Sequence, residues 1–114
     1  NSDDFIRFVQ DVFDCSLRYI EPPAKLITTV AICGGAGAEF IEHAIAQKAD
    51  IFITADMKYH EMQAAVGRIG LIDMDHWTSE QFTREIFNEL LQPHIQTHIA
   101  ENDKTPIKWL ISKE

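Results

Sequence analysis

Three short apolar segments, each followed by a turn and a helical pattern, most strongly limit what this chain can fold into. They are Ile27–Cys33, Ile51–Thr54 and Gly70–Met74. Their β-branched and other apolar residues are typical of strands that are buried on both faces. Such strands alternate with amphipathic helices, and right-handed crossovers connect this arrangement economically. The sequence therefore predicts a three-layer α/β sandwich with a mostly parallel, mixed central sheet, in which the three segments are neighbouring parallel strands.

The rest of the chain predicts helices around this sheet and a hairpin at the C-terminus. Apolar residues recur at helical spacing in four places: Asp3–Asp14, Ala38–Ala49, His60–Val66 and Thr78–Leu91. Leu17–Ile20 is predicted to be a further short strand, which Pro22 and Pro23 end. Alternating residues over 95–99 and 106–111, with a turn at 102–104, predict the C-terminal hairpin.

Composition and charge indicate one globular domain and exclude a nucleic-acid surface. The chain has 114 residues, of which 46% are hydrophobic and 25% charged, so we expect a single α/β domain over residues 1–114. Its formal net charge is −8, and its Lys and Arg residues are scattered. Nucleic-acid surfaces need clustered basic residues, whereas divalent cations suit an acidic protein.

The cysteines and the hydropathy of the chain indicate the cellular compartment in which we expect the protein. Cys15 and Cys33 have no CxxC spacing and form no disulfide framework, which favours a reduced, cytoplasmic protein. No segment approaches the roughly 20 apolar residues that a membrane span needs, so we expect no membrane partner. The chain begins at Asn1 rather than methionine, and we expect it to be a piece of a longer protein.

Polar residues gather where the three predicted parallel strands end. The turns in question are residues 34–37, 55–60 and 73–79. In parallel sheets, binding sites form beyond the carboxyl ends of the strands. We therefore expect these three turns to lie close together and to share one cleft.

The first of these turns, Gly34-Gly35-Ala36-Gly37, allows two interpretations. It follows a strand and opens a helix, so its free N–H groups are able to hold an anion. Phe40 stands where a dinucleotide-binding fingerprint requires a further glycine, and no Lys-Ser/Thr pair makes the turn a P-loop. A tight strand-to-helix turn without phosphate is the favoured reading.

The second turn places Asp56, Lys58, Tyr59 and His60 within five residues. Lys58 is suited to neutralising a substrate anion, and His60 is suited to proton transfer near neutral pH. Both residues are equally consistent with capping a helix or with a solvated loop.

The third turn contains His76 and Glu80, which are four residues apart. An imidazole and a carboxylate at this spacing converge on one point if both lie near the same helical turn. Two ligands are fewer than the three protein ligands of a typical catalytic zinc site, so a metal site must be completed from elsewhere. The alternative is a loop histidine followed by a glutamate that the helix dipole stabilises. The other histidines, at positions 43, 94 and 98, are expected to be solvated.

Three motifs in order resemble the C-terminal half of the NGG-interacting-factor family, many of whose members are named type 2 GTP cyclohydrolase I. The motifs are VAICGG, ADIFITADMKYHE and GLIDMDHWTSE, and the resemblance covers nearly all of the chain. Ala55 stands where the family usually has glycine, Asp75 replaces the glycine before the histidine, and Trp77 replaces a tyrosine.

The resemblance implies a site for two divalent metal ions, zinc, manganese or iron, in a cleft between two similar lobes. His76 and Glu80 fall on the family's C-terminal ligand positions, and Ser79 keeps the family's serine and lines the cleft. The remaining ligands, two adjacent histidines and an aspartate, belong to the family's N-terminal lobe. No adjacent pair of histidines occurs in this chain, so it is predicted to be the C-terminal lobe alone.

The function that the resemblance implies is metal-dependent hydrolysis of a nucleotide-like or other small molecule. In that scheme Asp56, Lys58, Tyr59 and His60 line the cleft, and no catalytic residue is assigned to this lobe. The family's ring-shaped hexamers, built from dimers, imply a homo-oligomer. The alternative is a non-catalytic metal-binding or protein-interaction module. We expect the isolated chain to bind metal weakly or not at all and to lack hydrolase activity.

Overall fold

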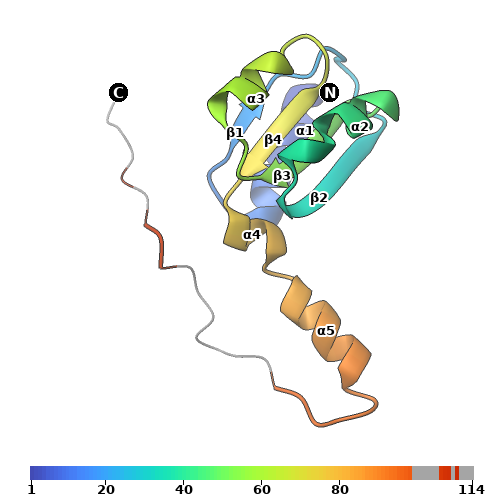
Figure 1. The fold of residues 1–114 in the computed structure, drawn as a ribbon, viewed down its shortest axis with the longest axis vertical. Helices are drawn as coiled ribbons and strands as arrows, with labels where there is room; N and C mark the ends of the chain where they lie inside the picture. Colours follow the sequence, from blue (N-terminus) through green and yellow to red (C-terminus); the bar gives the residue numbers. More distant parts are fainter. Residues whose placement is uncertain (99–105, 109, 111–114) are drawn as a thin grey trace. The chain divides into compact units, whose positions relative to one another are not determined.

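The computed structural model describes residues 1–98, 106–108 and 110, and the chain divides into two compact units. The first unit, residues 1–80, contains the whole sheet and the helices α1 to α4 (Figure 1). The second unit begins at Gln81 and contains helix α5. A single domain over 1–114 stays a prediction.

From β2 onward, strands and helices of the first unit alternate along the chain. Their bounds are α1 Ser2–Phe13, β1 Arg18–Ile20, β2 Val30–Ala36, a 3-10 turn η1 Ala38–Phe40, α2 Ile41–Ala46, β3 Ile51–Ala55, α3 Tyr59–Ala64, β4 Gly70–Met74 and α4 His76–Glu80. The second unit's helix α5 covers Thr83–Leu91. Over the described residues, no helix has the length and hydropathy needed to cross a bilayer.

The four strands form one mixed sheet in the order β1-β4-β3-β2. β3 pairs in parallel with β2 on one side and with β4 on the other, and β1 runs antiparallel to β4. The register joins Phe52 to Leu71 and Ile53 to Ile72 across the two central strands. The predicted α/β fold, with its three neighbouring parallel strands, is confirmed.

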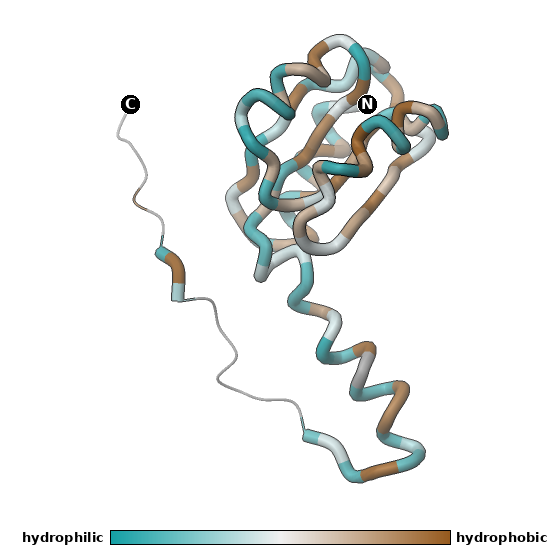
Figure 2. The backbone as a smooth tube through the Cα atoms, viewed as in Figure 1, coloured by the Kyte–Doolittle hydropathy of each residue, from teal (hydrophilic) through white to brown (hydrophobic). Residues whose placement is uncertain are grey.

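Helices cover both faces of this sheet, because the central strands are apolar on both sides. Ile51 and Ile53 belong to the core cluster beneath α1, whereas Phe52 belongs to the opposite cluster beneath α2 and α3. All five residues of β3 and all five of β4 are buried. The hydropathy colouring shows the most apolar chain in these central strands, with mixed colours on the surrounding helices (Figure 2).

Three predicted boundaries of β2 and α2 were wrong. β2 begins at Val30 rather than Ile27, because the N–H groups of Thr28 and Thr29 bond instead to the Asp50 carboxylate at 2.8 and 3.0 Å. β2 also continues through the glycines to Ala36. The helix predicted to end at Ala49 ends at Ala46, and Lys48 then adopts a left-handed φ of 61°.

The helix predicted over Thr78–Leu91 is two helices. α4 begins two residues earlier than predicted, at His76, and ends at Glu80. Its start follows from Asp75, whose carboxylate accepts the N–H of Thr78 at 3.2 Å and so caps the helix. His76 is therefore the first residue of a helix and not a loop residue.

The predicted C-terminal hairpin stays a prediction. Its turn at residues 102–104 and parts of both arms lie outside the described residues. The described parts of the arms, residues 95–98, 106–108 and 110, are not assigned to strands.

Candidate functional site at the carboxyl ends of the parallel strands

The carboxyl ends of β2, β3 and β4 lie at one edge of the sheet, and α4 follows β4 there after a single residue. α4 contacts both β2 and β3, below the strand ends in the view of Figure 1. The polar residues after the three strands therefore gather in one place, as parallel topology requires.

His76 and Glu80 lie one helical turn apart on α4 and point at each other. Nε2 of His76 is 3.1 Å from Oε2 of Glu80, and the two side chains are 47% and 48% exposed. The pair is thus in contact and open to solvent. An imidazole nitrogen and a carboxylate oxygen that share one point are a ligand pair that suits zinc and other divalent ions.

The other ring nitrogen of His76 has a different partner. Nδ1 contacts Oδ2 of Asp56, which follows β3. The hydrogen bond to Asp56 raises the pKa of His76, burial opposes the rise, and the nearby charge of Glu80 adds to it. The two carboxylates therefore favour positive charge at the ring, whether it is a proton or a metal ion that supplies it.

A glycine makes room for this arrangement. Gly35 has a φ of +72°, and a Cβ at this position would lie 2.5 Å from Oε1 of Glu80 and 3.2 Å from Nε2 of His76. The Glu80 carboxylate and the His76 ring therefore lie this close to the glycine turn only because position 35 has no side chain. The sequence predicts a glycine turn at this position but gives no indication that Gly35 contacts the site residues.

Ser79 attaches α4 to the glycine turn. Its hydroxyl donates to the carbonyl of His76 at 2.8 Å and accepts the N–H of Gly35 at 2.9 Å. Ser79 thus fixes the distance between the helix that carries His76 and Glu80 and the glycine turn beside them.

The turn that carries Asp56 is held by an ion pair beneath it. Asp73 accepts the N–H of Met57 at 3.0 Å, and Arg18 donates to the carbonyl of Met57 at 2.9 Å. Arg18 and Asp73 also bind each other, with Nε–Oδ2 and Nη2–Oδ2 distances of 3.0 and 2.5 Å. Neither residue was predicted to belong to the site, although a lone aspartate inside an apolar strand indicates a buried partner.

The three other residues predicted to line the cleft lie at the start of α3. Lys58 caps α3, and its N–H bonds to Oε1 of Glu61 at 2.8 Å. Tyr59 and His60 begin α3, and Tyr59 is 75% exposed. Over residues 1–98, no hydrogen bond or ion pair connects these three side chains to His76 or Glu80. They follow Asp56 closely in the sequence, but they make no such bond to His76 or Glu80.

Two ligating side chains, those of His76 and Glu80, converge at this site. Within the part of the chain that the structure describes, no three His, Cys, Asp or Glu side chains are arranged to hold one metal ion. His76 and Glu80 converge beside Gly35, so these residues fit two ligand positions of a metal site and no more.

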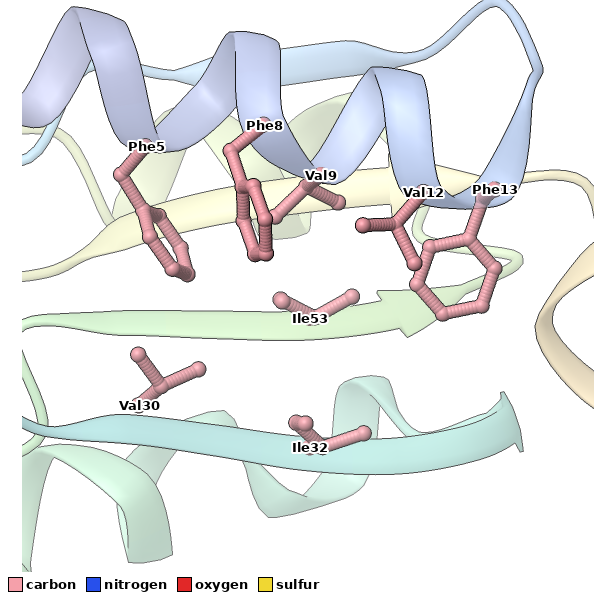
Figure 3. Close-up of a pocket in the computed structure, with 8 residues that line it drawn as sticks. All are labelled: Phe5, Phe8, Val9, Val12, Phe13, Val30, Ile32 and Ile53. Carbon is pink, nitrogen blue, oxygen red and sulfur yellow. The ribbon is translucent and has the colours of Figure 1, made fainter.

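A separate apolar groove lies between α1 and the strands β2 and β3 (Figure 3). Its volume is about 250 Å³, and every side chain that lines it is apolar. The groove holds no group that moves a proton or binds a metal, so it is unsuited to the chemistry of the His76 site. The lining residues are Phe5, Phe8, Val9, Val12, Phe13, Val30, Ile32 and Ile53.

Comparison with known proteins identifies the family. Residues 1–106 match the family model described as Duf34/NIF3 (NGG1p interacting factor 3). The chain belongs to the DUF34/NIF3 family. This confirms the resemblance that the three sequence motifs indicate.

Two DUF34/NIF3 relatives have the name GTP cyclohydrolase 1 type 2 homolog. The one from Staphylococcus aureus strain MSSA476 is 34% identical over 83 residues, which are 72% of this chain and 22% of the relative. The one from Streptococcus pneumoniae serotype 4 is 39% identical over 85 residues, covering 68% of this chain and 32% of the relative. The chain therefore spans between a fifth and a third of these proteins.

Solved structures support the same fold. A hypothetical protein of Staphylococcus aureus superposes with a TM-score of 0.82 at 25% identity, covering 94% of this chain and 38% of that one. A Bacillus cereus protein related to NIF3 gives a TM-score of 0.74 at 22% identity, over 96% of this chain and 32% of that one.

Asp75 stands directly before His76 and caps α4. It therefore contributes to the helix start that positions His76.

Proposed function

We propose that this chain supplies His76 and Glu80 to a divalent-metal site of a DUF34/NIF3 protein that is a metal-dependent hydrolase. The observation that carries the proposal is the convergence of Nε2 of His76 and Oε2 of Glu80 at 3.1 Å, close beside Gly35, which has no side chain to displace them. The name GTP cyclohydrolase 1 type 2 homolog, carried by the relatives, supports a nucleotide-like substrate.

Each residue has a defined part in this proposal. His76 offers Nε2, and Glu80 offers its carboxylate, to zinc, manganese or iron. Bound divalent ions supply Lewis acidity for the attack of water on an electrophilic centre of the substrate. Lys58 neutralises a substrate anion and His60 transfers protons at the rim of the cleft.

The rest of the metal site comes from outside this chain. Two ligands leave most coordination positions to be filled, and the family resemblance assigns the others, two adjacent histidines and an aspartate, to a second lobe. We call the protein that combines this chain with such a lobe the two-lobe protein. We propose that it is a cytoplasmic homo-oligomer, and the unpaired Cys15 and Cys33 are consistent with a reducing compartment.

A second candidate is a non-catalytic metal-binding or protein-interaction module. The apolar groove of about 250 Å³ beside α1 favours it, because a surface without polar lining suits an apolar partner better than a nucleotide. Turnover by the protein distinguishes the two functions.

The test is turnover by the two-lobe protein against a panel of nucleotides that includes GTP, with zinc, manganese or iron and after chelation. We expect hydrolysis of at least one nucleotide, its loss on chelation, and its recovery when metal returns. The variant His76→Ala should remove the metal-dependent turnover, whereas His43→Ala, at an exposed position on α2, should keep it. Stoichiometric metal binding without turnover on the whole panel would favour the second candidate.

A further inference from the structure

The two nitrogens of the His76 ring face carboxylates from two different elements. Nε2 faces Glu80 on the same helix, and Nδ1 contacts Asp56, which follows β3 and is 20 residues away in sequence. The Nε2 side also lies against the glycine turn, 3.2 Å from where a Cβ of residue 35 would be. The ring thus has one nitrogen directed at the proposed metal position and one directed at Asp56.

The backbone at Asp56 adopts an uncommon conformation. Its φ is 57°, in the left-handed region that residues other than glycine rarely occupy, although aspartate tolerates it better than most. Strained conformations persist where the surroundings hold them in place, and they concentrate at functional sites.

The surroundings hold this turn through the next residue. Both polar backbone groups of Met57 are fixed, the N–H by Asp73 at 3.0 Å and the carbonyl by Arg18 at 2.9 Å. The side chain of Met57 is buried in the core beneath α2 and α3. The Asp56 carboxylate therefore projects toward His76 from a turn whose next residue, Met57, is held by hydrogen bonds to both its N–H and its carbonyl.

We propose that Asp56 is a positioning residue: its carboxylate accepts the proton on Nδ1 of His76 and thereby directs the Nε2 lone pair to the point shared with Glu80, where a divalent cation binds. This inference rests on the proposed function, since it concerns the same site. Metal-binding histidines generally donate their other N–H to a carboxylate or carbonyl, which fixes the ring's tautomer and orientation. Asp56 contacts the opposite nitrogen and is therefore not a third ligand.

The variants that test the proposal tolerate a positive φ, so the turn is retained. Asp56→Gly removes the carboxylate, and Asp56→Asn keeps an oxygen that accepts from Nδ1. Glu80→Ala is the matched control, because it removes the carboxylate on the other side of the ring. Unchanged backbone resonances away from the site, in ¹H–¹⁵N spectra, show that each variant is folded.

The first measurement is the tautomer of His76 in the metal-free chain, by long-range ¹H–¹⁵N NMR at a pH at which the ring is neutral. We expect the Nδ1–H form to dominate in the wild type, in Asp56→Asn and in Glu80→Ala. In Asp56→Gly the population should shift to the Nε2–H form. The same tautomer populations in Asp56→Gly as in the wild type overturn the proposal.

The second measurement is a zinc titration of the two-lobe protein, followed at the His76 resonances. We expect Asp56→Gly to bind zinc about 10- to 100-fold more weakly than the wild type, and Asp56→Asn to lose less. Equal zinc affinity of Asp56→Gly and the wild type also overturns the proposal. If zinc shifts no His76 resonance in the wild-type two-lobe protein, the proposed function fails, whereas the tautomer result still decides the role of Asp56.

Discussion

Asp73→Ala is expected to lower the free energy of unfolding by about 2 to 3 kcal/mol, because it removes the acceptor of three hydrogen bonds. The Asp73 side chain is only 9% exposed, and it binds Arg18 and the N–H of Met57. Without it, the buried N–H of Met57 has lost its partner and the Arg18 guanidinium has lost its counter-charge. Because Arg18 is 56% exposed, water compensates part of the loss, which keeps the effect below that of a fully buried pair.

The control is an ion pair of the same chemistry on the surface. Arg68 and Glu42 are joined at 2.7 Å, and their side chains are 45% and 71% exposed. Glu42→Ala should therefore change the urea midpoint little, whereas Asp73→Ala should lower it clearly, with circular dichroism as the measurement. Asp73→Ala should also weaken zinc binding and Glu42→Ala should not, because only Asp73 supports the turn that carries Asp56. Equal losses of stability in the two variants would show that the Arg18–Asp73 pair is no more than a surface contact.

Gly35→Ala is expected to weaken zinc binding at His76 by roughly 10- to 100-fold, the range seen when groups that hold metal ligands are disturbed. The new methyl carbon would lie 2.5 Å from Oε1 of Glu80, so the carboxylate has to leave the position in which it contacts His76. The variant also places alanine at a φ of +72°, which costs on the order of 1 kcal/mol of stability.

Gly67→Ala separates these two effects. Gly67 has a similar φ of +79°, but a Cβ there meets nothing within 4 Å. Both variants should therefore lose about the same stability, on the order of 1 kcal/mol, in urea unfolding. Only Gly35→Ala should lose zinc affinity in a titration followed by NMR. A similar zinc affinity in both variants would mean that the close approach of Glu80 to Gly35 has no part in the site.

The fold was predictable where one local signal decided the structure. β4 was predicted with its bounds, Gly70–Met74, because a glycine opens an apolar run and polar residues close it. The start of α4 was missed because it depends on Asp75 acting as a cap, and Asp75 is equally plausible as a loop residue. The split between α4 and α5 was missed because apolar residues continue at helical spacing across residues 81 and 82.

The candidate site was predictable only in part. The spacing of His76 and Glu80 was enough to predict their convergence, since both lie on one helix. The contact of His76 with Asp56 depends on a left-handed turn after β3, and sequence spacing contains no information about it. The Arg18–Asp73 pair depends on the register of β1 against β4, in which these two residues are opposite each other. Such long-range pairings follow from tertiary structure and not from local pattern.

Zinc titration calorimetry tests most directly whether this chain holds half of a metal site at His76 and Glu80. The comparison uses the isolated chain, the two-lobe protein and the two-lobe protein with His76→Ala. We predict weak binding by the isolated chain, because two protein ligands replace little of the metal's hydration. The two-lobe protein should bind zinc tightly, and His76→Ala should weaken that binding by at least about tenfold. Tight, stoichiometric binding by the isolated chain that persists after His76→Ala would contradict both the ligand assignment and the half-site account.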